Sequence, residues 1–273
     1  MLLGVGAAVV VLGGVLYVTL GRYLFARGTT TPVPLEEIEQ RYFASTTTTT
    51  AGGPTAAPAT SAAARPAIEV LPQPGVYVYA TSGSDRIDAL GGDHHDYPPT
   101  TTITVTAAGC GVQQRWDVLE ERWEAWQRCA GPDGATVSEP ARTNYDEFFA
   151  NGVRDDYVCV GDARPLAASP GSVWMTACTD QDGNAETHAG TVVGPERRQV
   201  AGAAVDTTHV TVVVTDQDSR NLQTIDTWYL DGTDLVVAQT STDHAVNPSP
   251  IGDVDYDEQY SIELTSLTPI TAG

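Results

Sequence analysis

Two short segments hold the side-chain types best suited to metal or acid–base chemistry. Residues 93–97 read DHHDY, and two histidines with two carboxylates can ligate zinc or another transition metal. His94 and His95 are adjacent, however, and neighbouring residues of an extended chain point in opposite directions. Because glycines and prolines flank the segment, we expect a solvated loop, in which His94 and His95 are the candidate metal ligands.

The second segment, residues 180–186, reads DQDGNAE and is similar to half of a calcium-binding loop. Gly183 directly follows the second acid, whereas an EF-hand loop has a third ligand before its glycine. We therefore expect a β-turn with Asp182 and Gly183 at its tip. A later acidic run is expected to be a charged strand edge or loop, and it comprises Asp253, Asp255, Asp257 and Glu258.

Sequence motifs of common enzymes are absent from the chain. It contains no G-x-S-x-G or S-x-x-K nucleophile motif, no H-E-x-x-H zinc motif, and no glycine pattern for phosphates or dinucleotides. We therefore expect a protein that is not an enzyme and that holds no cofactor.

Three of the five tryptophans, Trp116, Trp123 and Trp126, fall within eleven residues. Packing in a core is the commonest role of such residues, and lining an apolar ligand groove is the functional alternative. Tyr77 and Tyr79 lie in a segment that alternates in the same way as a half-buried strand. These five aromatic residues are the candidates for the lining of a groove.

The four cysteines form two pairs with the same spacing, Cys110 with Cys129 and Cys159 with Cys178. Four cysteines allow three connectivities, and we expect these sequential pairs because each would close a local hairpin. The alternative is a metal site, but no C-x-x-C occurs and no histidine is close to a cysteine in sequence. Disulfides indicate an oxidising compartment.

The segment 111–128 between the first two cysteines permits two structures. Its apolar residues recur at helical spacing, but a straight helix of this length would hold Cys110 and Cys129 about 28 Å apart. A hairpin that turns near Leu119 and Glu120 would bring the cysteines together and would place Trp116 opposite Trp123. We expect the hairpin, with the helix as the alternative.

Period-two alternation rich in β-branched residues predicts most of the remaining strands. The predicted strands are 76–81, 100–106, 172–178, 187–193, 209–215, 224–230, 235–242 and 260–267. Asp231–Asp234 (DGTD) predicts a tight hairpin between two of them. The expected fold is mainly β: a single antiparallel sheet, curved or closed into a half-barrel, with few short helices.

The charge of the chain excludes several partners. The formal net charge is −21, all 14 basic residues are arginines, and nearly all of the acidic residues lie after residue 66. Nucleic acids and anionic headgroups bind basic patches, so we expect no nucleic-acid partner.

The first part of the chain predicts a membrane anchor. Residues 2–20 carry no charge and would rise about 28 Å as a helix, close to the thickness of a bilayer core. A cleaved signal peptide is the alternative, although its apolar region is usually shorter. Arg22 and Arg27 favour a cytoplasmic domain, whereas the cysteines favour an extracytoplasmic one, and we expect the latter.

Composition divides the chain into three parts. Residues 1–27 are the anchor and its flank, and residues 67–273 form one β-rich extracytoplasmic domain. Residues 28–66 are rich in Thr, Pro and Ala and are expected to be a disordered linker, with a helical turn or two near 34–43.

Several loose motifs mark a resemblance. They are the HDYP of residues 95–98 before a Thr-rich strand, the W-x6-W-x2-W-x2-C run ending at Cys129, and YSIELTSLTP of residues 260–269. With the anchor and linker, the chain resembles membrane-anchored envelope proteins of actinobacteria, and its expected sheet is similar to the LolA and LppX type. That resemblance implies an open half-barrel that shelters acyl chains. The chain differs in having no lipobox cysteine.

Together these observations predict a single-pass protein of the cell membrane with its C-terminal domain outside the cytoplasm. We expect a non-enzymatic domain that binds an apolar or amphiphilic, lipid-like ligand of the cell envelope. The alternative is a protein-interaction or accessory module of an envelope complex.

Overall fold

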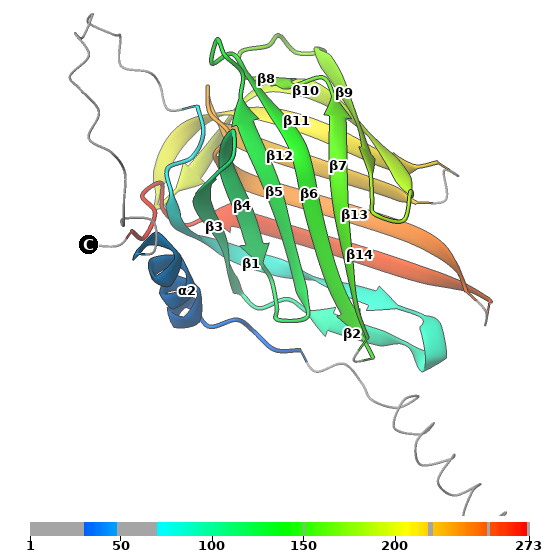
Figure 1. Cartoon of the computed structure of the whole chain (residues 1–273). Coiled ribbons are helices and arrows are strands. Elements are labelled where there is room, and N and C mark those ends of the chain that lie inside the picture. The colour runs from blue at the N-terminus through cyan, green and yellow to red at the C-terminus, as the bar shows by residue number, and fades with distance from the viewer. Residues whose placement is uncertain (1–29, 48–69, 150, 218–220, 250–251, 272–273) are drawn as a thin grey trace, which may run out of the picture.

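The computed structural model describes residues 30–47, 70–149, 151–217, 221–249 and 252–271, which form a single closed sheet with one α-helix on its outside (Figure 1). The helices are α2 (Leu35–Thr47) and the short 3-10 helix η2 (Ala89–Gly91). The strands are β1 (Gly75–Ile87), β2 (Asp93–Asp96), β3 (Thr100–Ala108), β4 (Gly111–Asp117), β5 (Arg122–Ala130), β6 (Thr136–Phe148), β7 (Asn151–Gly161), β8 (Arg164–Pro165), β9 (Val173–Thr179), β10 (Ala185–Val200), β11 (Ala203–Asp216), β12 (Leu222–Leu230), β13 (Val236–Ser249) and β14 (Gly252–Leu264).

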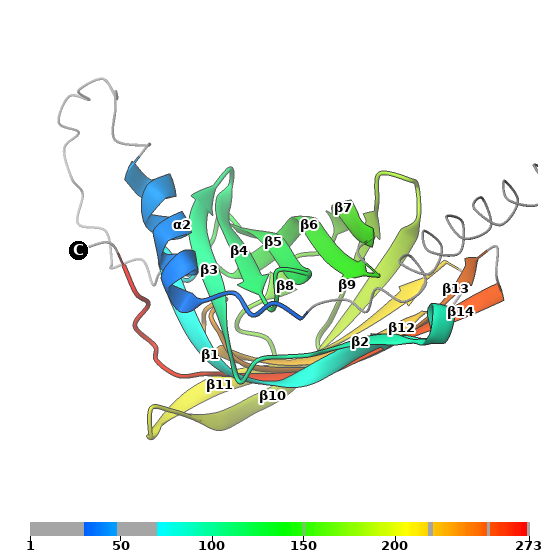
Figure 2. The same ribbon diagram turned by 90° about the horizontal axis from the view of Figure 1, so that it is seen from below.

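Neighbouring strands of the sheet are nearly always neighbours in sequence. The order runs from β14 back to β3, then β1 and β2, every pairing is antiparallel, and β1 also pairs with β14. Leaving aside β2 and β8, the remaining twelve strands therefore form a closed ring. Figure 2 shows the sheet wrapping around an interior, with α2 against its outer side.

The prediction of a mainly β, antiparallel fold is confirmed, but the sheet closes where a curved sheet or half-barrel would stay open. Closure depends on β1, whose residues 79–87 pair with β14 while residues 75–80 pair with β3. Gly83 lies at the contact with β14 with φ +156°, and a Cβ there would stand 2.5 Å from the carbonyl oxygen of Gln259. The close approach of these two strands therefore requires glycine.

All eight strands expected from alternation coincide with strands of the sheet, although Ser172, Leu235 and residues 265–267 lie just outside them, and the hairpin at Asp231–Asp234 is confirmed as the β12–β13 connection. Segment 111–128 is the hairpin β4–β5 rather than a helix. Its register differs by one residue from the expected one, since Trp116 pairs with Glu124 and Trp123 with Asp117.

A β-bulge explains this shift of register. The backbone N–H groups of Val118 and Leu119 both donate to the carbonyl oxygen of Arg122, so two residues oppose one just before the turn at residues 120 and 121. A shift of one residue reverses the faces of a strand pair. The Trp116 side chain consequently points into the interior of the closed sheet, and the Trp123 side chain lies on its outer face.

Both predicted disulfides, Cys110–Cys129 and Cys159–Cys178, are present. Cys159 and Cys178 lie directly opposite each other on β7 and β9, which pair over only four residues. The bond therefore crosslinks the shortest seam of the closed ring.

Residues 30–47 lie within the predicted disordered linker but pack against the sheet. Helix α2 buries Ile38 and Tyr42 against Val76 of β1, with Val33 and Leu35 packed beside them. The spacing of Leu35, Ile38 and Tyr42 places them on one face of a helix, and this apolar face provides the burial that the rest of the linker lacks.

The predicted anchor, residues 1–27, lies outside the described residues, as does most of the remaining linker. In the part of the chain that the structure describes, no helix is both long enough and apolar enough to cross a membrane.

Candidate functional site

The interior of the closed sheet is divided into an apolar half and a charged half. The apolar half is filled by a single cluster that includes Tyr79, Val105, Trp116, Val210 and Ile262. The charged half contains a cavity of about 470 Å³, which we call the acidic chamber. Of the described residues, seven carboxylates and two guanidinium groups line it: Glu124, Asp146, Asp155, Asp180, Glu186, Asp216 and Asp243 with Arg122 and Arg142.

Alternation along the strands places these charges on the inner face. Arg122 and Glu124 are two residues apart on β5, and Arg142, Asn144 and Asp146 follow the same period on β6. Residues spaced by two share one face of a strand, so each strand presents a row of polar groups to the chamber. In the second half of β7 the outward positions hold valines, with Val158 67% exposed and Val160 69% exposed, whereas Arg154 and Asp156 occupy the outward positions of the first half.

Arg122 is the centre of one set of ion pairs at the chamber wall. Its side chain is 4% exposed and forms a salt bridge with Glu124, lies 3.0 Å from Asp146 Oδ1 through Nε, and lies 3.0 Å from Glu258 Oε1. One guanidinium group thus faces three carboxylates in a buried setting, where unpaired charge is costly.

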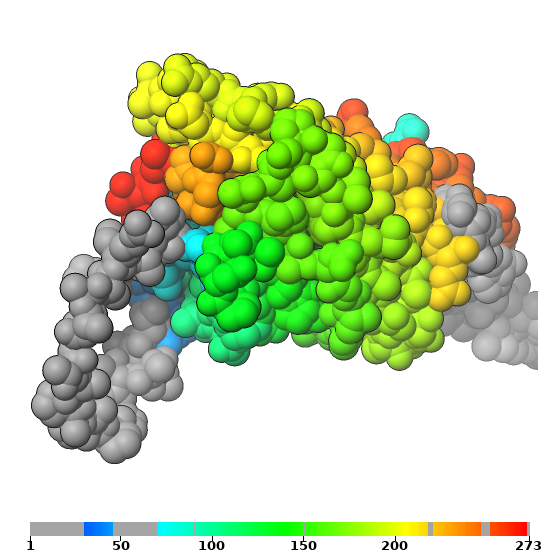
Figure 3. Space-filling view, turned by 90° about the horizontal axis from the view of Figure 1, so that it is seen from above, coloured from blue at the N-terminus to red at the C-terminus, as the bar shows by residue number. Residues whose placement is uncertain are grey.

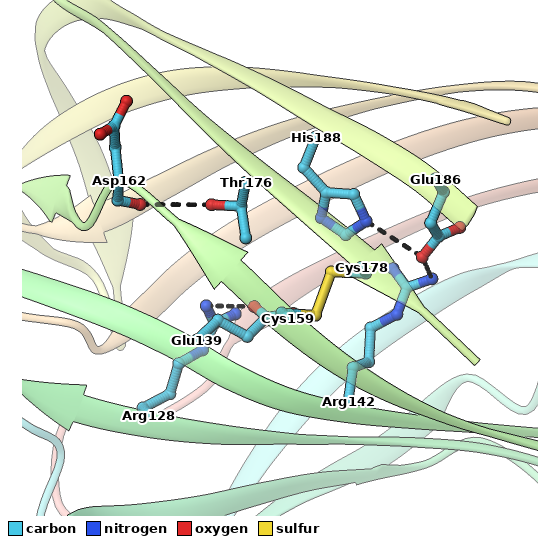
Figure 4. Close-up of a disulfide and its surroundings, with 9 residues drawn as sticks. All are labelled: Arg128, Glu139, Arg142, Cys159, Asp162, Thr176, Cys178, Glu186 and His188. Carbon is cyan, nitrogen blue, oxygen red and sulfur yellow. Dashed lines mark hydrogen bonds and ion pairs between the residues drawn. A yellow bond between two sulfur atoms is a disulfide. The ribbon is translucent and has the colours of Figure 1, made fainter. Parts of the chain in front are cut away.

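The second set of ion pairs lies beside the Cys159–Cys178 disulfide (Figure 4). Arg142 forms a salt bridge with Glu186, whose Oε1 is 3.0 Å from His188 Nε2. Burial raises the pKa of Glu186, but the charge of Arg142 and the hydrogen bond of His188 outweigh it, so the pKa of Glu186 lies below its usual value.

Three other carboxyl groups have the opposite shift. Burial raises the pKa of Glu258 to about 8, of Asp146 to about 7 and of Asp243 to about 6, although Arg122 lowers each of them in part. The chamber, through Asp243 and Asp146, and the wall behind it, through Glu258, therefore gain negative charge as the pH rises from about 6 to 8.

Asp243 differs from the other two because its carboxyl group has no hydrogen-bond or ion-pair partner among the described residues. It lies on β13 and faces the chamber, near enough to Arg122, Glu124, Arg142 and Glu186 for their charges to shift its pKa. Both guanidinium groups are already held by other carboxylates. Asp243 is consequently available to a ligand.

A buried polar network lies behind the chamber wall, and it includes the predicted metal ligand His95. His95 Nδ1 is 2.8 Å from Asp85 Oδ1, the Tyr97 hydroxyl donates to Asp85 Oδ2 at 3.2 Å, and the same hydroxyl donates to Glu258. Burial lowers the pKa of His95, but the hydrogen bond and charge of Asp85 outweigh this effect and raise it.

The expectation of a solvated loop at residues 93–97 is wrong. Residues 93–96 form β2, and His95 is fully buried because it pairs with Asp85 of β1 and stacks on Phe148. His94 points away from it and lines an outer recess. The two histidines therefore do not meet at one metal ion.

The predicted turn at residues 180–186 is confirmed and borders the chamber. Asp180 Oδ1 accepts hydrogen bonds of 2.8 Å from the backbone N–H groups of Asp182 and Asn184. In the described part of the chain, one group of side chains has the spacing of a metal site: Cys178, Glu186 and His188. Cys178 is in a disulfide, and its sulfur is therefore not a free thiolate ligand.

The five aromatic residues expected to line a groove do not form one. Tyr77, Tyr79 and Trp116 belong to the apolar core, where the Trp116 indole donates to Thr101 Oγ1 at 2.9 Å. Trp126 packs against that core and lines a second interior cavity of only about 90 Å³. Trp123 lies on the outer face, stacked on Tyr145 and under the guanidinium group of Arg115.

Sequence reasoning missed the residues that do line a large cavity. Strands β6 and β7 have polar residues on their inward positions, so they lack the apolar alternation used to find strands. Arg142, Asn144 and Asp146 are polar residues at every second position, and this spacing was a signal that one face of a strand could present charged groups to an interior.

The arrangement suits binding of positive charge. Among the described residues that line it, carboxylates exceed guanidinium groups by five, and the low dielectric of a partly enclosed cavity strengthens their attraction for a cation. Comparison of the chain with models of protein families, with curated proteins and with solved structures finds no match.

Proposed function

We propose that this protein is a non-enzymatic binding protein whose acidic chamber takes up a small organic cation. The observation that carries the proposal is the carboxyl group of Asp243, which faces a cavity of about 470 Å³ and has no hydrogen-bond or ion-pair partner among the described residues. A half-buried carboxylate without a cationic partner costs free energy when it is ionised, and a cationic ligand would remove that cost.

The lining favours an organic cation over a bare metal ion. The cavity is far larger than one ion needs, and its wall includes the rings of Tyr157 and Tyr256 and the aliphatic groups of Val214, Ala245 and Val246. Aromatic faces attract ammonium and guanidinium groups, and the aliphatic groups suit an attached carbon chain. The proposed ligand is thus amphiphilic, with its charge as the main contact.

We further propose that the domain acts outside the cytoplasm, tethered to the cell membrane by the apolar segment at residues 2–20. The two disulfides support an oxidising compartment. The uninterrupted apolar run supports retention in the membrane.

Isothermal titration calorimetry at pH 7.5 tests the ligand class. The probes are 1,5-diaminopentane, spermidine, tetramethylammonium, calcium chloride and decanoate. We expect an organic cation to bind, and Asp243→Asn to weaken it at least tenfold. Asp206→Asn is the control, because this aspartate pairs with Arg197 on the exposed outer face. Binding of decanoate alone, or organic-cation binding that Asp243→Asn leaves unchanged, would refute the proposal.

A second function is favoured by the outer face of β7 and β9. Val158, Val160, Val173 and Met175 are each more than half exposed there. In Figure 3 the yellow-green segment that contains β7 and β9 lies at the surface of the molecule. Exposed apolar patches are typical of protein-interaction surfaces, so an accessory role in an envelope complex is the second candidate. Crosslinking in native membranes tests it: Val160→Asp should abolish any adduct that Val193→Asp, further along the outer face on β10, preserves.

A further inference from the structure

We propose that the end of the closed sheet that contains the acidic chamber, where β5 begins and β6 ends, faces the membrane, so that the chamber receives its ligand from the lipid–water interface. The proposal rests on the tether proposed above. It concerns which end of the domain meets the bilayer, and the observations that support it are the contacts of residues 30–47.

The described chain begins at the chamber end of the sheet. Thr31 donates two hydrogen bonds to the carboxylate of Glu121, from its backbone N–H at 2.9 Å and from Oγ1 at 2.6 Å. The backbone N–H of Glu120 in turn donates to the carbonyl oxygen of Thr31 at 2.9 Å. Glu121 is 7% exposed, so this attachment is buried as well as bidentate.

The turn that holds Thr31 is part of the chamber rim. Glu120 and Glu121 connect β4 to β5, and the next residue, Arg122, lines the chamber. The carbonyl oxygen of Glu121 accepts a hydrogen bond from the backbone N–H of Glu147, which directly follows the chamber residue Asp146. The chain therefore enters the domain beside the chamber opening.

Helix α2 prevents this entry point from moving along the sheet. Ile38 and Tyr42, 2% and 6% exposed, are buried against Val76, so residues 30–47 form a strap fixed at both ends. The predicted linker consequently does not act as a long spacer before the domain.

Chain length then limits the orientation. Thr30 follows Leu20, the end of the apolar run, by ten positions, so the segment between them spans at most about 35 Å when fully extended. Strand β10 runs from Glu186 in the chamber to Val200 at the opposite end, about 45 Å along the strand. Strands of a closed sheet tilt by about 35–45°, so the height of the sheet along its axis is roughly 35 Å. Only a fully extended tether could therefore bring the opposite end to the bilayer while the strap holds, and a relaxed tether favours the chamber end.

Charge indicates which bilayer surface fits. The recess where Thr30 emerges includes Asp88, Asp93, Asp255 and Asp257 with one arginine, Arg86, which pairs with Asp257, and the chamber adds its own carboxylates. Anionic headgroups would be repelled, whereas zwitterionic headgroups, whose outer group is a cationic amine, would be attracted. We therefore assign a bilayer surface rich in zwitterionic headgroups as the partner of this end.

Photocrosslinking of the full chain in phosphatidylethanolamine/phosphatidylcholine nanodiscs tests the orientation. A photoreactive amino acid replaces either Asp182, exposed at the chamber rim, or Gln199, exposed at the opposite end. We expect at least fivefold more lipid adduct at position 182. Glu121→Ala, which removes the attachment of Thr31, should bring the two adduct yields within twofold of each other. Thr31→Val should also bring the two yields closer together, and it should disturb the structure of the domain less than Glu121→Ala.

The outcomes separate this proposal from the ones on which it rests. Equal yields in the unmodified chain, or a higher yield at position 199, would overturn the orientation while leaving tether and chamber standing. A full chain that does not co-migrate with nanodiscs would overturn both tether and orientation. Cation binding in the calorimeter is measured separately and bears on neither.

Discussion

The two halves of the interior are built on the same strands, but one is filled with apolar side chains and the other holds charged side chains around a cavity. In the apolar half, Tyr79, Trp116 and Ile262 are almost completely buried and remove apolar surface from water. In the charged half, Arg122 is equally buried, but it is held by carboxylates around a cavity. The apolar half stabilises the fold, whereas the unmatched negative charge of the charged half lowers the stability in exchange for a binding site.

The largest expected effect comes from emptying the apolar half. Trp116→Ala should lower the free energy of unfolding by about 4 kcal/mol, because it leaves a cavity and removes the hydrogen bond from the indole to Thr101 Oγ1. Urea denaturation measures the loss. Trp123→Ala is the matched control, since Trp123 lies on the outer face, and it should cost about 1 kcal/mol. Equal losses would mean that the two tryptophans are not on opposite faces.

Removing the charge of Arg122, at the centre of the charged half, should lower the free energy of unfolding by slightly less, and this loss should depend on pH. Arg122→Met leaves Glu124, Asp146 and Glu258 without their shared partner, and we expect a loss of about 3 kcal/mol at pH 8. At pH 5 the carboxyl groups with raised pKa are protonated, so the loss should shrink. Denaturation at both pH values measures this, and a loss independent of pH would contradict the assigned ion pairs.

The pH profile of the unmodified protein should distinguish the halves further. The native pKa of Asp146, about 7, exceeds that of an unfolded aspartate, so the native state binds more protons between about pH 4 and 7. Stability from this group is present below pH 4 and is lost as the pH rises through 7, by at most about 1.4 kcal/mol for each pH unit between the two pKa values. Asp146→Asn should flatten the profile, whereas Asp206→Asn on the outer face should leave it unchanged.

The smallest expected effect is a gain in the free energy of unfolding. Asp243→Asn removes an unpartnered carboxylate from the chamber and should raise the free energy of unfolding by about 0.5–1 kcal/mol at pH 8. The same substitution should weaken cation binding. Thermal denaturation at pH 8 checks the gain, and a loss of stability would indicate that Asp243 already has a partner in the protein.

Much of the fold could be predicted from short-range sequence patterns, because strands that face the apolar half of the interior alternate between apolar and polar residues. Segments such as 76–81 and 100–106 alternate since one face is buried among apolar groups, and the cysteine spacing matched hairpin closure. The chamber could not be predicted in this way. Strands β6 and β7 carry polar groups inward, and a period-two pattern of charges reads as an exposed loop unless their surroundings are known.

His95 illustrates the same limit from a single position. Its neighbours in sequence, glycines and prolines, indicate a loop, and its own polarity indicates exposure. Its burial depends on Asp85, ten residues away, and on Phe148, which β6 brings across the sheet. Long-range pairing decided its environment.

The sequence by itself determined that the domain is antiparallel β, that its cysteines pair locally, and that its surface is strongly acidic, because these properties depend on neighbouring residues and on composition. Only the tertiary structure decided that the sheet closes, that residues 30–47 are strapped to it, and that the charges of β5, β6, β10 and β13 meet around one chamber. Closure joins β1 to β14 across most of the chain, and such distant contacts leave no local pattern to read.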